Sequence, residues 1–88
     1  MTVLDVRPAD EYAAGHIPGA LNATLAELER VLPRLTPDME VVAYCRGPYC
    51  VYAYQAVAAL RHFGIHARRM DGGLPEWRED GLPVLAGT

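Results

Sequence analysis

The chain has no long apolar segment and no leader-like start. No stretch approaches the 18 or more consecutive apolar residues of a membrane span, and the N-terminus lacks a basic segment followed by an apolar core. Internal repeats and low-complexity segments are also absent. We therefore expect no contact with a membrane and, unless a leader was trimmed away, a cytoplasmic location.

Lysine is missing, and charges of one sign do not cluster. Arginine supplies all eight basic residues, a bias without a physical explanation, and eleven acidic residues bring the formal net charge to -3. Such a chain offers no basic patch for phosphates. We therefore expect no direct nucleic-acid binding by these residues.

Cysteine is scarce but informative. The 88 residues suffice for one domain. Its two cysteines are Cys45 and Cys50. Two cysteines could form one disulfide in an exported protein, whereas in a reducing compartment such a pair more often performs redox or nucleophilic chemistry.

Short apolar runs predict three strands, at 3–6, at 41–44 and, more weakly, at 67–70. Helices are predicted between them. Leucines at helical spacing mark 25–32, and the alanine-rich segment 51–63 contains no glycine or proline. This alternation predicts a small three-layer α/β domain, with a mainly parallel sheet and helices on both faces.

The ends of these helices also carry signals. Thr24 and Glu27 have the spacing of a capping box, and Pro33 and Pro37 are expected to end the first helix. Gly64 is expected to end the second. Further on, Trp77 is predicted to fill the core from a short helix that Pro75 begins.

Cys45 follows the second predicted strand, where ligands of such sheets bind. A cysteine between a strand and a helix meets aligned backbone N–H groups and the positive end of a helix dipole, which favour the thiolate. The alternative is a small buried cysteine at a strand end. The turn at Gly47 and Pro48, with Cys50 at the start of the next helix, favours the reactive cysteine.

Three motifs in order resemble the rhodanese-like sulfurtransferase domains. The N-terminal motif comprises residues 4–7, 11–12, 15–20 and 22, the C-terminal motif comprises 71–73, 77 and 81–84, and the cysteine loop lies between them. The resemblance implies that Cys45 accepts a sulfane sulfur as a persulfide and passes it to a thiol or to cyanide. It implies a small sulfur donor, a thiol acceptor, no cofactor and no metal. The loop expected to surround the outer sulfur comprises Arg46, Gly47, Pro48, Tyr49, Cys50 and Val51.

Two features depart from the family pattern. Cys50 stands where thiosulfate-using members often carry an arginine, and only two residues precede the first predicted strand, so 1–88 reads as a single domain without the usual first strand and helix. The cysteine loop is similar to that of rhodanese-like domains fused behind winged-helix regulators of the arsenic-repressor type. An upstream regulatory domain in the natural protein is consistent with that similarity.

The sequence leaves the roles of several residues open. Cys50 is either a resolving thiol, which would make the domain a redox or persulfide sensor, or a half-buried packing residue. Arg46 either attracts an anionic donor or is a solvated charge. Four further residues are expected to give structural support: Asp5 by accepting backbone N–H groups, Arg7 and Glu11 by pairing across a turn, and His16 by bonding to backbone.

Other classes of protein fit the sequence less well. Cys45, Cys50, His62 and His66 have nearly the spacing of a zinc finger, but Gly64 interrupts the helix between the histidines. A phosphatase loop would need an arginine where Val51 stands. A noncatalytic rhodanese-like module would commonly lack the cysteine.

Overall fold

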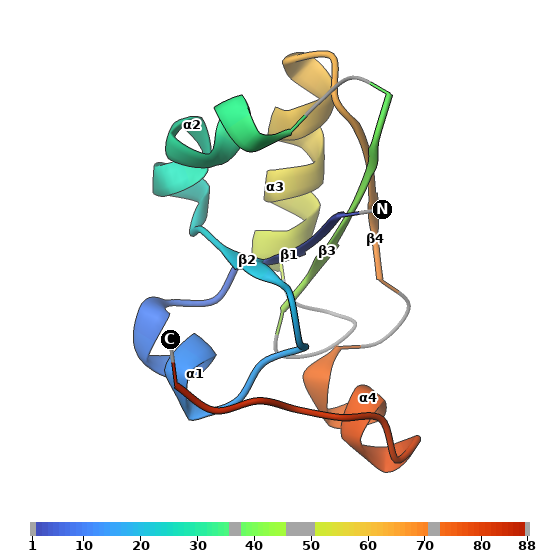
Figure 1. Ribbon diagram of the computed structural model, residues 1–88. Coiled ribbons are helices and arrows are strands. Elements are labelled where there is room, and N and C mark those ends of the chain that lie inside the picture. Colours follow the sequence, from blue (N-terminus) through green and yellow to red (C-terminus); the bar gives the residue numbers. More distant parts are fainter. Residues whose placement is uncertain (1, 36–37, 46–50, 71–72, 88) are drawn as a thin grey trace.

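Four parallel strands form the centre of the protein (Figure 1). The structure is a computed structural model, and it describes residues 2–35, 38–45, 51–70 and 73–87. In chain order they are β1 (Thr2–Asp5), β2 (Leu21–Asn22), β3 (Glu40–Tyr44) and β4 (His66–Arg69). Their spatial order is β2-β1-β3-β4, and every pair is parallel. The three predicted strands are therefore confirmed, and β2 is an addition at the edge.

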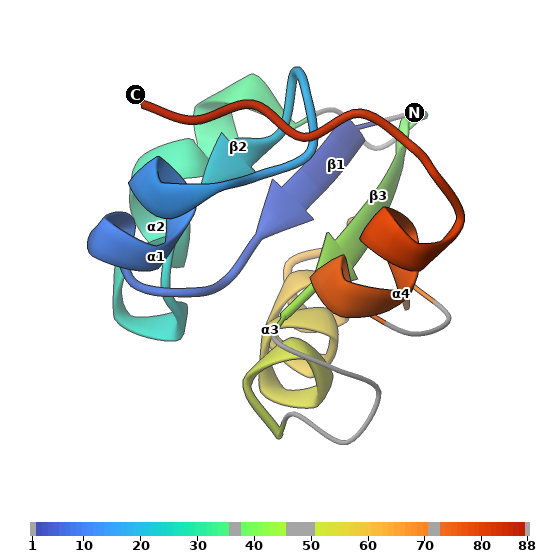
Figure 2. The ribbon, with the colours of Figure 1, turned by 90° about the horizontal axis from the view of Figure 1, so that it is seen from below.

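Helices cover both faces of this sheet, as predicted for a three-layer α/β domain. The helices are α1 (Ala9–Ala14), α2 (Leu28–Val31), α3 (Val51–His62) and α4 (Leu74–Glu79). Buried residues of α2 and α3 pack in one core cluster, whereas Tyr12 of α1 and Leu74 of α4 contribute to the other. Figure 2 shows the C-terminal segment leaving α4 and crossing one side of the molecule toward the side of β2.

The two cores meet the sheet through alternating side chains of β3. Val41, Ala43 and Cys45 belong to the core beneath α2 and α3, whereas Tyr44 belongs to the core beneath α1 and α4. This is the two-residue period of a strand buried on both faces. As a result, Cys45 and Tyr44 serve opposite faces of the sheet although they are neighbours in sequence.

The helix predictions succeeded to different degrees. α3 is confirmed, and Gly64 follows it in the left-handed region, at φ 81°, which suits glycine. The helix predicted at 25–32 is confirmed only in its middle, where α2 lies. Its capping box is present, with Thr24 N–H donating to Glu27 Oε1 at 3.1 Å, but 3-10 turns at Leu25–Glu27 and Leu32–Arg34 leave α2 only four residues.

The short last helix carries the predicted core residue. Trp77 packs partly buried against the second core, and its indole Nε1–H donates to the Pro83 carbonyl at 2.6 Å. Pro75 lies at the start of α4, which begins at Leu74. Within the described ranges, no helix is both long and apolar enough to cross a membrane.

Candidate active site

Cys45 lies directly after β3, at the carboxyl edge of the sheet, and only 1% of its surface is exposed. Its carbonyl accepts the N–H of Leu74 from α4 at 3.4 Å. One residue earlier, the Tyr44 carbonyl accepts the N–H of Val6 at 3.1 Å. Backbone from both sides therefore holds the residues that place the sulfur at this edge.

Most of the loop predicted to surround the sulfur falls outside the described residues. This applies to Arg46, Gly47, Pro48, Tyr49 and Cys50, so the resolving role of Cys50 and the cradle remain predictions. Val51, the last predicted loop residue, is the first described residue of α3 and is 59% exposed.

A buried ion pair lies one strand away from Cys45. Asp5 is fully buried at the end of β1, and its carboxylate accepts the Arg7 backbone N–H at 2.9 Å and the Arg7 Nη2 at 2.7 Å. Burial opposes the charge on Arg7, but hydrogen bonds and charge from Asp5 outweigh it and raise the pKa of the guanidinium. The expectation that Asp5 accepts backbone N–H groups is met by Arg7 itself.

The expectation that Arg7 pairs with Glu11 is wrong. The Arg7 guanidinium binds Asp5 and the Gly15 carbonyl instead. The physical reason is burial. The Asp5 carboxylate has no exposed surface, so it needs a charged partner more than the partly exposed Glu11 carboxylate does.

Tyr44 completes this cluster, although no sequence motif pointed to it. Its hydroxyl donates to Asp5 Oδ2 at 2.7 Å and accepts the Ile17 N–H at 3.1 Å. Burial, the largest cause, raises the pKa of this hydroxyl; the Ile17 N–H lowers it in part, and the Asp5 carboxylate raises it further. A tyrosine at the end of a buried strand was the available signal, since its hydroxyl must find a partner.

His16 belongs to the same edge. It is 5% exposed, its ring stacks on Tyr12 with centroids 3.7 Å apart, and its Nδ1 lies 2.7 Å from the Tyr12 carbonyl. Its backbone also pairs with Leu85 from the C-terminal segment. The predicted turn histidine bonded to backbone is therefore what the structure contains.

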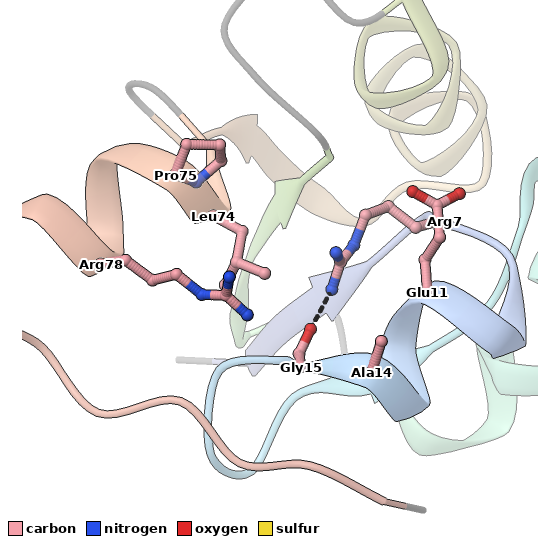
Figure 3. Close-up of a pocket in the computed structure, with 7 residues that line it drawn as sticks. All are labelled: Arg7, Glu11, Ala14, Gly15, Leu74, Pro75 and Arg78. Atoms are coloured by element: carbon pink, nitrogen blue, oxygen red, sulfur yellow. Dashed lines mark hydrogen bonds between the residues drawn. The ribbon is translucent and has the colours of Figure 1, made fainter.

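A pocket of about 550 Å³ opens between α1 and α4, beside the ion pair (Figure 3). Arg7 and Glu11 line it on one side, Leu74 and Arg78 on the other. Because Leu74 also donates its N–H to Cys45, this pocket adjoins the backbone of the cysteine.

The geometry argues against the zinc-finger alternative. His66 pairs with Glu40 at the amino end of β3, five residues or about 16 Å from Cys45 along the strand. His62 ends α3, which runs back toward that same end. In the parts of the chain that the structure describes, no group of three or more potential metal ligands occurs.

These features define a parallel α/β domain with a cysteine at the carboxyl edge of its central strand, and sequence comparison supplies the family. Residues 1–80 match the model of the rhodanese-like domain. A sulfurtransferase of Allochromatium vinosum is 33% identical over 85 residues, which cover 96% of this chain and 78% of that protein. A thiosulfate:glutathione sulfurtransferase of Homo sapiens is 36% identical over 93 residues, covering 88% and 78%. The chain belongs to the rhodanese-like domain family.

Solved structures agree with this assignment. The crystal structure of the Rhodanese_3 like domain from the Anabaena sp. Alr3790 protein superposes with a TM-score of 0.90 at 32% identity, covering all of this chain and 94% of that one. The predicted family and fold are thus confirmed.

The family also includes parts of regulators. An HTH-type transcriptional regulator of Mycobacterium tuberculosis is 54% identical over all 88 residues. The chain spans 39% of the length of that regulator. This relative agrees with the predicted similarity to domains found in transcriptional regulators.

Proposed function

We propose that this domain transfers sulfane sulfur through a persulfide on Cys45. The donor is thiosulfate, a persulfide or a polysulfide, and the acceptor is a thiol or cyanide. The observation that supports this most is the position of Cys45 directly after β3, in a chain whose relatives include sulfurtransferases. The Val6 N–H fixes the Tyr44 carbonyl and the Leu74 N–H fixes the Cys45 carbonyl at this edge of the sheet. The residues from Arg46 to Val51 form the cradle in this proposal.

The chemistry needs no oxidant or metal. The Cys45 thiolate attacks the outer sulfur of thiosulfate, a bond forms between Sγ and that sulfur, and the bond to the sulfonate group breaks. Sulfite leaves with the electron pair. An acceptor thiolate then attacks the outer sulfur of the persulfide, and Cys45 leaves as a thiolate.

A second candidate is a sensing module without appreciable turnover. The 54% identical regulator and the cysteine at position 50 favour it. Here the Cys50 thiolate attacks Sγ of the Cys45 persulfide, an intraloop disulfide forms, and hydrosulfide leaves with the electron pair. Cys50 also removes a cation that would otherwise bind the sulfonate of the donor.

Thiosulfate:cyanide sulfur transfer in the wild type and in Cys50→Arg separates the two candidates. If the domain is an enzyme, the wild type turns over, and Cys50→Arg is faster because the arginine adds a second cation beside Arg46. A sensor turns over poorly, and its persulfide resolves to a species about 2 Da lighter than the reduced protein, the mass of two hydrogens lost to a disulfide. Cys50→Ser is the matched control, because it retains the nucleophile and cannot form that disulfide. Fast wild-type turnover, no gain from arginine and no disulfide would reduce Cys50 to a packing residue.

A further inference from the structure

Among the described residues that line the pocket between α1 and α4, one arginine is not used by the fold. Arg78 is exposed on α4, and within the described residues its guanidinium makes no side-chain hydrogen bond and no ion pair. Arg7, the other arginine of the pocket, is committed to Asp5 and Gly15. An anion that enters this pocket would therefore find Arg78 available.

Gly15 makes room for this guanidinium. A Cβ built on Gly15 would collide with Nη2 of Arg78, and Figure 3 shows the Arg78 side chain reaching across the pocket toward this residue. The φ of Gly15 is 168°, an extended conformation that any residue adopts. Space rather than backbone conformation therefore explains the glycine.

The pocket also adjoins the backbone of Cys45 at the carboxyl edge of the sheet. Leu74 is one helical turn before Arg78 on α4, so the two side chains share a face. Leu74 lines the pocket, and its N–H donates to the Cys45 carbonyl. A ligand that extends along α4 can thus approach Arg78 at one end and the edge that bears Cys45 at the other.

We propose that this pocket binds the carboxylate of the thiol that accepts sulfur from Cys45, with Arg78 as its ion-pair partner. This inference rests on the proposed function. At about 550 Å³ the pocket is far larger than the five-atom thiosulfate ion needs and is in the range of small-molecule sites. Ala14, Leu74 and Pro75 offer an apolar wall for the body of such a thiol.

The charges favour one carboxylate over a polyanion. Among the described residues that line the pocket, Arg78 provides a single uncommitted cation, which suits one carboxylate. In the transfer itself the acceptor thiolate attacks the outer sulfur of the Cys45 persulfide, the bond between that sulfur and Sγ breaks, and Cys45 keeps the electron pair. The carboxylate takes no part in the bond changes and only orients the thiol.

Binding is tested by NMR titration with an unreactive probe, S-methyl-N-acetylcysteinylglycine, and with its C-terminal amide, which lacks the carboxylate. We expect the acid to shift the amide resonances of Gly15 and Arg78 and to bind about fivefold more tightly than the amide, the upper range for an exposed ion pair. Arg78→Gln should abolish this preference. The matched control is Arg34→Gln, an exposed arginine of the turn after α2, which should retain it.

Transfer provides the second readout. In Arg78→Gln we expect the KM for N-acetylcysteinylglycine to rise about fivefold, whereas the KM for its C-terminal amide should not change. Gly15→Ala should act in the same direction, because its methyl group displaces the guanidinium. Equal binding of acid and amide by the wild type, or an unchanged preference in Arg78→Gln, overturns the inference. If Cys45 forms no persulfide, the proposed function and the acceptor role fail together, while the titration alone decides whether Arg78 binds carboxylate.

Discussion

The Tyr44 hydroxyl donates a hydrogen bond of 2.7 Å to the Asp5 carboxylate. The two residues are paired in register at the carboxyl ends of β3 and β1, and Cys45 is the next residue after Tyr44. The same hydroxyl accepts the Ile17 N–H, so the N-terminal motif is fixed to the strand that presents the cysteine.

Removing this hydroxyl should destabilise the domain. Tyr44→Phe leaves the Ile17 N–H without its acceptor and takes one donor from a fully buried carboxylate, so we expect the free energy of unfolding to fall by about 1–3 kcal/mol. Urea unfolding measures the loss. Tyr52→Phe, on the exposed side of α3, is the control and should change stability by less than about 0.5 kcal/mol. Equal losses of unfolding free energy in Tyr44→Phe and Tyr52→Phe would show that the buried Tyr44 hydroxyl stabilises the domain no more than an exposed one.

Replacing one partner of the Asp5–Arg7 pair should lower the free energy of unfolding more than replacing both partners. Asp5→Asn leaves a guanidinium that is 7% exposed without its counter-charge, at an expected cost of about 3–5 kcal/mol. Adding Arg7→Met should recover part of that loss, with a coupling free energy of at least about 1 kcal/mol between the two sites.

Glu40→Gln provides the matched control for this cycle. Glu40 pairs with Arg68 at 3.1 Å, but both side chains are about half exposed. Its effect should therefore stay within about 1 kcal/mol. Additive losses in the Asp5 and Arg7 double variant would contradict the coupling.

Stability should fall in alkali because of Tyr44. Its pKa is raised in the folded protein, so the protonated form is favoured there and the unfolded state loses its proton first, from about pH 10 upward. The contribution is complete below that pH and is lost as pH rises toward the folded pKa, by up to about 1.4 kcal/mol per pH unit. The difference in unfolding free energy between wild type and Tyr44→Phe, measured from pH 8 to 11.5, should therefore shrink above pH 10. A constant difference would contradict this assignment.

Local sequence signals predicted three of the four strands and missed β2, the two-residue strand at one edge of the sheet. β3 and α3 carry clear apolar patterns, and Gly64 follows α3 as expected. β2 has only two residues and exists because Leu21 and Asn22 pair with β1, which no local pattern encodes. The segment 25–32 has helical spacing, but Pro33 cannot continue an α-helix, and 3-10 turns replace its ends.

The site was predicted in the same uneven way. Cys45 stands out because a motif surrounds it, and Asp5, Arg7 and His16 because they belong to the first motif. Arg78 has no motif of its own; it faces Gly15, 63 positions earlier, only because α4 packs beside the end of α1. The partner of Arg7 was misassigned because helical or turn spacing suggested Glu11, whereas burial of Asp5 decides the pairing.

The intact mass of two variants after exposure to thiosulfate or polysulfide tests the central claim, that Cys45 carries the transferred sulfur. Cys50→Ser keeps the nucleophile and removes the thiol that could resolve a persulfide, so it should gain about 32 Da, the mass of one sulfur atom. Cys45→Ser should gain nothing under the same conditions. No gain on Cys50→Ser, or an equal gain on Cys45→Ser, would contradict the account.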